Sequence, residues 1–135
     1  FGLWFNVNNH KRYMKEVHKV RRELHNLERS HNLANVVFVT TTAQHFCSKG
    51  GVYTGQNSPK CCDVKHLNTF RQDYAMKFLI EPLHLTYFNA FNITKNWFGA
   101  HPSEKGDCTH LCSNDNGPLI RFGLEFLSFI QHAQI

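Results

Sequence analysis

The continuous apolar run Val36-Val37-Phe38-Val39 constrains the fold of this chain more than any other stretch. Its residues are mostly β-branched and uninterrupted, which is typical of a strand covered on both faces in a parallel sheet. The segment before it, from about 10 to 30, has apolar residues at helical spacing with basic residues between them. These apolar residues are Met14, Val17, Val20, Leu24 and Leu27. The sequence therefore predicts an amphipathic helix that leads into a buried strand.

The same alternation continues along the chain. Apolar spacing predicts a second helix over 64–78, which Pro82 ends, and a strand over 85–93. A last helix is expected over 118–132, because proline suits the first turn of a helix. That helix is apolar nearly all round, so we expect it to pack deep against other elements. Helices and strands in this order predict an α/β layered fold with a mainly parallel sheet.

Two long loops follow the predicted strands, at 41–63 and 94–117. Loops of more than about 15 residues in a compact domain are usually functional or tied by disulfides. Sites in parallel sheets form in the loops beyond the carboxyl ends of the strands, so we expect these two loops to lie together. They hold all the cysteines of the chain, which are Cys47, Cys61, Cys62, Cys108 and Cys112.

The bulk composition argues against two classes of partner. The net charge is +5, and much of the positive charge lies between residues 11 and 22. We interpret this segment as a solvated helix face, because no nucleic-acid-binding signature accompanies it. No stretch approaches the roughly 20 apolar residues of a membrane span. The sequence therefore predicts no nucleic acid partner and no membrane span in this segment.

The setting of the cysteines suggests an oxidising compartment. Glycine, proline and asparagine surround them, as in disulfide-tied loops of secretory proteins. Because their number is odd, one cysteine is free, is bonded to another chain, or has a partner that this chain lacks. Asn92-Ile93-Thr94 is a glycosylation sequon and agrees with the secretory route.

The chemistry of the chain is concentrated in Asp107-Cys108-Thr109-His110-Leu111-Cys112. Asp and His three residues apart can meet on one tight loop, where the carboxylate takes the proton of one ring nitrogen and aims the other at a nucleophile. Such pairs also occur as capped turns without catalytic function. With a cysteine on either side of the histidine, we interpret Asp107 and His110 as the orienting acid and the base of a serine esterase or acyltransferase.

Two other histidines and a zinc site are further candidates in these loops. His101 precedes a proline in a loop, where a structural or surface histidine is expected more often than a catalytic one. His45 could cap a strand end or face the site. Zinc held by the cysteines and His110 is the alternative use of this cluster. Cys108 and Cys112 have ligand spacing but the adjacent pair Cys61-Cys62 does not, so we predict no metal.

Ala100-His101-Pro102-Ser103 and the Asp107-to-Cys112 step together resemble the closing signature of the PC-esterase branch of the GDSL/SGNH hydrolases. This branch includes the trichome-birefringence-like polysaccharide O-acetyltransferases. Its pattern is Asp/Gly-Ala-His-Pro-Ser and then Asp-Cys-(Ser/Thr)-His-Trp-Cys. The segment from Val39 to Phe46 resembles the strand-end block of the family, which closes in His-Phe. Gly2-Leu3-Trp4-Phe5 resembles the Gly-His-Trp-Trp that follows the oxyanion asparagine.

The resemblance implies a fold and a chemistry. The fold would be a three-layer α/β/α SGNH-like, flavodoxin-like parallel sheet. Asp107 and His110 match the acid and base of the triad, and Gly2 would lie beside the oxyanion-hole loop. The implied reaction is acyl transfer through an acyl-serine, with a glycan or polysaccharide hydroxyl and an acyl donor as substrates and no cofactor. A Golgi lumen or extracellular location would follow.

The resemblance also implies disulfide pairs. Cys108 would pair with Cys61 or Cys62. Cys112 would pair with a cysteine upstream of this chain, or with Cys47.

This sequence departs from the family pattern at several points. It contains no Gly-Asp-Ser block, and Ser48, Ser58 and Ser103 stand in the wrong context to replace its serine. Leu111 replaces the usual Trp, and Gly99 stands where Asp is common. We therefore expect residues 1–135 to be the C-terminal portion of one such domain. The alternatives are a catalytically inactive secreted module that binds glycans or other partners, and a small zinc-binding domain.

Overall fold

The computed structural model describes residues 10–29, 36–55, 60–102, 106–112 and 117–133. They form two compact units, each built from two separate stretches of chain. The sheet unit takes its described residues from 1–41 and 69–89, and the disulfide unit takes them from 42–68 and 90–135.

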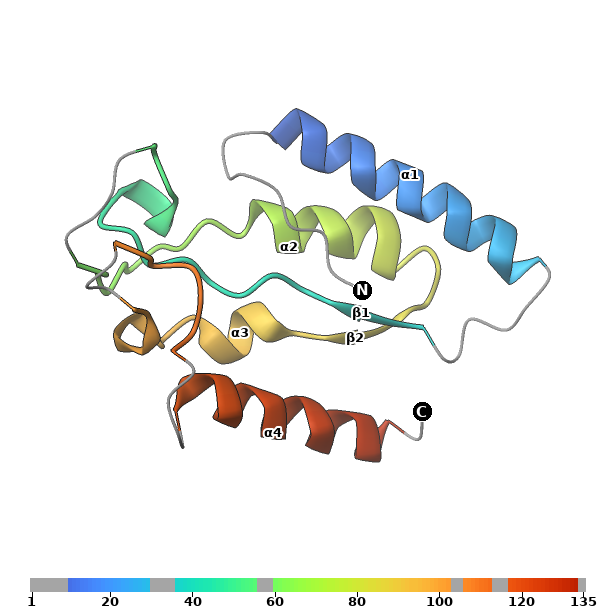
Figure 1. The fold of residues 1–135 in the computed structure, drawn as a ribbon. Helices are drawn as coiled ribbons and strands as arrows, with labels where there is room; N and C mark the ends of the chain where they lie inside the picture. The colour runs from blue at the N-terminus through green and yellow to red at the C-terminus, as the bar shows by residue number, and fades with distance from the viewer. Residues whose placement is uncertain (1–9, 30–35, 56–59, 103–105, 113–116, 134–135) are drawn as a thin grey trace. The chain divides into compact units, whose positions relative to one another are not determined.

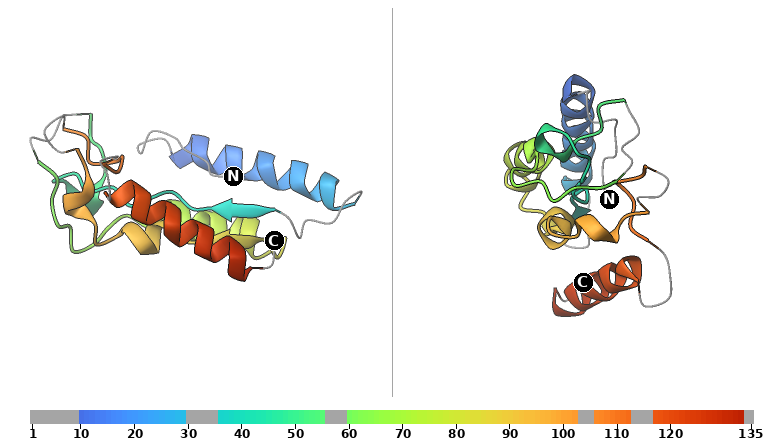
Figure 2. Two further views of the ribbon diagram at one scale, coloured as in Figure 1. Left: turned by 60° about the horizontal axis from the view of Figure 1, so that its bottom comes forward. Right: turned by 90° about the vertical axis from the view of Figure 1, so that its left-hand side faces the viewer.

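The sheet unit contains two parallel strands with helices (Figure 1). Its elements are α1 (His10–Glu28), β1 (Val37–Val39), α2 (Phe70–Ala75), the π-helical turn η3 (Met76–Ile80) and β2 (Thr86–Phe88). The strands pair in parallel with Phe38 opposite Tyr87, and the N–H of Thr40 extends the pairing by donating to the carbonyl of Phe88 at 3.1 Å. Figure 1 shows the two strands side by side, and the left view of Figure 2 shows β1 as a cyan arrow. The amphipathic helix and the strand after it are thus confirmed.

An apolar core holds the sheet unit together. Phe38 of β1 is 3% exposed, and Leu79 and Val17 are fully buried. The complete cluster is Tyr13, Val17, Phe38, Ala75, Leu79, Ile80, Leu83 and Leu85. Its members on α1 lie four residues apart, so one stripe of the helix faces the core while the basic residues stay outside.

Two predicted elements differ from the structure. The second helix begins at Phe70 and not at residue 64, because the N–H of Asn68 donates to the carbonyl of Gly50 at 2.9 Å and keeps the preceding residues in the loop. The strand predicted over 85–93 is β2 followed by helix α3 (Ala90–Thr94). The hydroxyl of Thr94 donates to the carbonyl of Ala90 at 2.8 Å and closes this single helical turn.

The disulfide unit consists of loops and of helices η2 (Lys49–Gly51), α3, η4 (Phe98–Ala100) and α4 (Pro118–His132). Helix α4 begins at the predicted proline, with Gly117 as its N-cap. The prediction that it packs deep is wrong, since none of its residues is buried and Leu124 is 63% exposed. Among the described helices, none has both the length and the apolar character that crossing a membrane requires.

Thr94 anchors the start of the first long loop. Its fully buried hydroxyl accepts the N–H of Ala43 at 2.9 Å, in addition to its bond to Ala90. We expect Thr94→Val to lower the free energy of unfolding by about 1–3 kcal/mol, because it leaves a buried N–H without an acceptor. Urea denaturation measures this, with Thr94→Ser as the control that keeps the hydroxyl. Equal unfolding midpoints for the valine and serine variants would contradict the assignment.

Candidate active site

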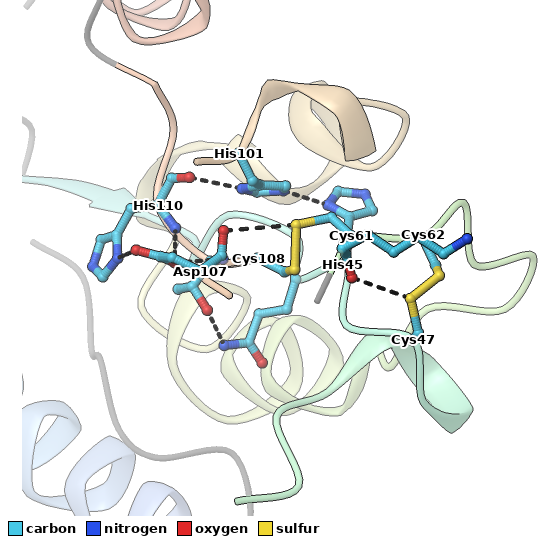
Figure 3. Close-up of a disulfide and its surroundings, with 11 residues drawn as sticks. His45, Cys47, Cys61, Cys62, His101, Asp107, Cys108 and His110 are labelled. Atoms are coloured by element: carbon cyan, nitrogen blue, oxygen red, sulfur yellow. Dashed lines mark hydrogen bonds and ion pairs between the residues drawn. A yellow bond between two sulfur atoms is a disulfide. The ribbon is translucent and has the colours of Figure 1, made fainter. Parts of the chain in front are cut away.

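Two disulfides build the frame of the site. Cys61 is bonded to Cys108 and joins the two long loops, while Cys47 is bonded to Cys62 (Figure 3). Cys61 is one of the two partners that the resemblance implied for Cys108. The alternative pairing of Cys112 with Cys47 is wrong, because Cys62 takes that place, and Cys112 is a half-buried free thiol. Disulfides of this kind are typical of proteins that mature in an oxidising compartment.

Main-chain hydrogen bonds align the two loops beside the disulfides. The N–H of His45 donates to the carbonyl of Cys108 at 3.0 Å, and the N–H of Cys62 donates to the carbonyl of His45 at 2.8 Å. The side-chain amide of Gln44 donates to the hydroxyl of Thr109 at 3.0 Å. Gln44 and His45 therefore fix the Asp107-to-His110 turn at Cys108 and Thr109.

Asp107 and His110 meet on this turn. One carboxylate oxygen, Oδ1, accepts the backbone N–H groups of Thr109 and His110, each at 3.0 Å. The other, Oδ2, accepts Nδ1–H of His110 at 2.7 Å. An ionised carboxylate only accepts hydrogen bonds, so in the neutral ring the proton sits on Nδ1 and the lone pair on Nε2. The His110 side chain is 72% exposed and that of Asp107 is 30% exposed.

The turn that Asp107 caps therefore also carries its hydrogen bond to the imidazole of His110. The bonds to Oδ1 shape the turn, and the bond from Oδ2 sets the tautomer of the imidazole. A carboxylate that holds a histidine in this way prepares it to take a proton from a hydroxyl.

The environment of Asp107 favours its charged form. Burial alone raises the pKa of this carboxyl, but the hydrogen bonds from the N–H groups of His110 and Thr109 and from the His110 ring together lower the pKa below its ordinary value. Because the pKa is lowered on folding, the ionised group contributes stability that is fully present above the unfolded value of about 3.9. That contribution disappears as the pH falls through the folded-state pKa.

Asp107→Asn is consequently expected to make stability less sensitive to acid. The wild type should lose stability more steeply than the variant as the pH falls below about 4. Urea unfolding followed from about pH 6 to about pH 2 measures both slopes. If the free energy of unfolding falls equally steeply with pH in the wild type and in Asp107→Asn, then Asp107 has the same pKa in the folded and unfolded chain.

A buried pair of histidines contacts the turn at the carbonyl of His110. His101 Nδ1 donates to the carbonyl of His110 at 2.7 Å, and His101 Nε2 lies 2.7 Å from Nδ1 of His45. His45 Nε2 donates to the carbonyl of Lys95 at 2.9 Å. The two rings are only 1% and 4% exposed. Sequence reasoning left the position of His45 open and did not find this pair, because the rings are 56 residues apart and their outer partners are backbone carbonyls.

The remaining predicted site residues are placed as follows. Gly2 lies outside the described residues. Asn92 is exposed on α3. The zinc alternative needs Cys61 and Cys108 as thiolates, whereas both are in a disulfide. Among the described residues, no group of three or more His, Cys, Asp or Glu side chains is arranged to hold a metal ion.

Comparisons with known proteins returned no match: no family model fits this chain, and no curated protein or solved structure is significantly similar to it.

Proposed function

We propose that this chain carries the base and orienting acid of a serine-type esterase or O-acetyltransferase that acts on glycan hydroxyls. The observation that supports it most is the 2.7 Å bond from His110 Nδ1 to Asp107 Oδ2, with the imidazole exposed on a turn that a disulfide braces. The resemblance to the PC-esterase pattern supplies the substrate class. The parallel pairing of β1 and β2 is compatible with an SGNH-type sheet.

The chemistry is a double displacement. Nε2 of His110 takes the proton of a serine hydroxyl while the serine oxygen attacks the acyl carbonyl, and Asp107 stabilises the resulting imidazolium. The imidazolium gives the proton to the departing alcohol or other leaving group, which leaves an acyl-serine. His110 then takes a proton from water in an esterase, or from a sugar hydroxyl in a transferase. The new oxygen attacks the acyl group, and the proton returns to the serine.

The proposed mechanism needs a nucleophilic serine that we do not find among these 135 residues. Ser48 is engaged elsewhere, since its hydroxyl donates to the carbonyl of Val52 at 2.6 Å. On this proposal, the Gly-Asp-Ser block is encoded in the same gene outside the present chain. The chain by itself then holds a base without a nucleophile.

The proposed location is the Golgi lumen or the extracellular space, which share the oxidising conditions that the two disulfides indicate. We expect Asn92 to carry an N-glycan after expression in a eukaryotic secretory host. Loss of mass on treatment with a glycosidase specific for N-glycans, absent in Asn92→Gln, measures this. A wild-type chain that passes through the secretory pathway without a mass change would contradict it.

The test of the function compares two proteins. The complete gene product and the 135-residue chain are each mixed with 4-nitrophenyl acetate and with acetylated xylan oligosaccharides. We expect the complete product to release nitrophenol in a burst through an acyl-serine, and the 135-residue chain to show none. A burst from the chain alone would overturn the proposal. Glycan binding without acyl transfer by the complete product would instead identify an inactive binding module.

A further inference from the structure

The buried histidine pair lies in a continuous line of three polar contacts. Figure 3 shows the contact from His45 to His101 and the contact from His101 to the carbonyl of His110. The line runs from the carbonyl of Lys95 to His45, from His45 to His101, and from His101 to the carbonyl of His110. The three contacts measure 2.9, 2.7 and 2.7 Å, which are hydrogen-bond distances. The line ends on the peptide group of the candidate base.

The number of protons in this line follows from the donors and acceptors. A carbonyl oxygen only accepts, so the outer nitrogen of each ring has to donate. A neutral imidazole has a single N–H. Two neutral rings would donate both of their protons to the carbonyls. Their inner nitrogens would then face each other as two lone pairs at 2.7 Å. In every other pair of neutral tautomers, at least one carbonyl oxygen faces a ring lone pair. Three contacts need three protons, and the two neutral rings have only two.

We propose that His45 and His101 share one additional proton as a singly charged imidazole–imidazolium pair, and that this pair positions His110 through its carbonyl. His101 is thus a positioning residue for the base and does not itself touch substrate. This positioning role rests on the function proposed above, whereas the shared proton does not.

The surroundings lower the pKa of both rings below the ordinary value, so the shared charge has to be held by the hydrogen bonds of the line. Burial is the largest influence on both rings and lowers the pKa of each. The Lys95 carbonyl and the charge of Asp63 act against this at His45. At His101, the His110 carbonyl and Asp107 raise the pKa, while the rings of His45 and His110 lower it. A central N–H···N bond between a charged and a neutral ring is of the stronger, charge-assisted kind.

The pair makes the position of His110 depend on pH. His110 is held at three atoms, because its N–H and its ring Nδ1 bind Asp107 and its carbonyl binds His101. When the shared proton leaves at higher pH, one of the three contacts in the line turns repulsive. The anchor of the carbonyl then loosens while both bonds to Asp107 remain.

The first measurement is nitrogen-15 NMR of the histidine rings in the 135-residue chain across pH. We expect one proton to leave His45 and His101 in a single shared step, with a far-downfield proton coupled to nitrogens of both rings. His45→Gln and His101→Gln should each abolish that signal and leave the other ring titrating alone. His25→Gln, at an exposed position on α1, is the matched control and should change nothing. Two independent titrations, or a pair that stays neutral down to acid unfolding, would overturn the proposal.

The second measurement uses the activity of the complete gene product. His101→Phe, which has no donor, should lower kcat by about a hundredfold, the scale of a misplaced catalytic group. His101→Gln keeps an N–H that does not titrate. This variant should restore most of kcat. It should also remove the fall of kcat at alkaline pH that loss of the shared proton produces. An unchanged pH profile in His101→Gln would refute the positioning role. An inactive wild type with the shared proton in place would refute only the proposed esterase or transferase activity.

Discussion

Alanine in place of His110 is expected to lower kcat for acyl transfer by the complete gene product roughly 10⁴-fold or more. The base that removes the serine proton in the proposed mechanism is then absent. The fold should be retained, since the His110 ring is mostly exposed and its backbone contacts do not need the side chain.

Asp107→Asn should lower kcat by a similar factor, about 10⁴-fold, for a different reason. The amide oxygen can still accept the N–H groups of Thr109 and His110, so the turn is kept. The amide nitrogen, however, faces Nδ1 of His110 as a donor. The ring is forced into the tautomer with its proton on Nε2, which cannot act as a base.

Steady-state and burst kinetics with 4-nitrophenyl acetate measure both losses. His132→Ala is the control, because His132 is an exposed histidine on α4. It should leave kcat within about twofold, in line with the small effects of ordinary surface substitutions. Variants at 107 and 110 that keep wild-type turnover would exclude these residues from the chemistry.

The disulfide between Cys61 and Cys108 is expected to contribute most to the stability of the site. It closes a sequence separation of 47 residues, whereas the bond from Cys47 to Cys62 closes 15. The loss of chain entropy in the unfolded state corresponds to about 4 kcal/mol for the first and about 3 kcal/mol for the second. Removing the first also detaches the Asp107-to-His110 turn from the other loop.

Denaturant unfolding without reductant tests this order. We compare Cys61→Ala/Cys108→Ala with Cys47→Ala/Cys62→Ala, and use Cys112→Ser as the control, since Cys112 is a free thiol. The control should stay within about 0.5 kcal/mol of wild type. A Cys61→Ala/Cys108→Ala variant as stable as that control would show that the bond does not constrain the fold.

Local elements of the fold could be predicted where one physical signal dominates. Helix α1 and strand β1 follow from hydrophobic spacing and β-branching, and α4 begins where Pro118 favours a first turn. The strand expected over 85–93 is confirmed for Thr86–Phe88 and is wrong from Ala90 onward. The apolar pattern there does not report the side-chain bond from Thr94 to Ala90 that closes a helical turn. For helix α4 the position was predicted correctly but the burial was not. Its apolar residues predicted burial, but Leu124 and Leu127 are exposed in the described part of the chain.

The candidate site was predictable in part. Asp107 and His110 lie within one turn, so their spacing alone brings them together. The contacts that fix their turn join Gln44, His45 and Cys61 of the first loop to Cys108 and Thr109 of the second, and no local pattern encodes them. His45 and His101 are the clearest example, because their roles follow from two carbonyls and a proton count that only the three-dimensional arrangement reveals.

Covalent labelling with a fluorophosphonate, followed by peptide mass spectrometry, tests most directly whether the imidazole on this turn activates a serine. In the complete gene product we predict that one serine is labelled and that His110→Ala abolishes the labelling. That serine should lie outside the present chain, whose serines are Ser30, Ser48, Ser58, Ser103, Ser113 and Ser128. Labelling that persists in His110→Ala, or that falls on a serine of these 135 residues, would contradict the account.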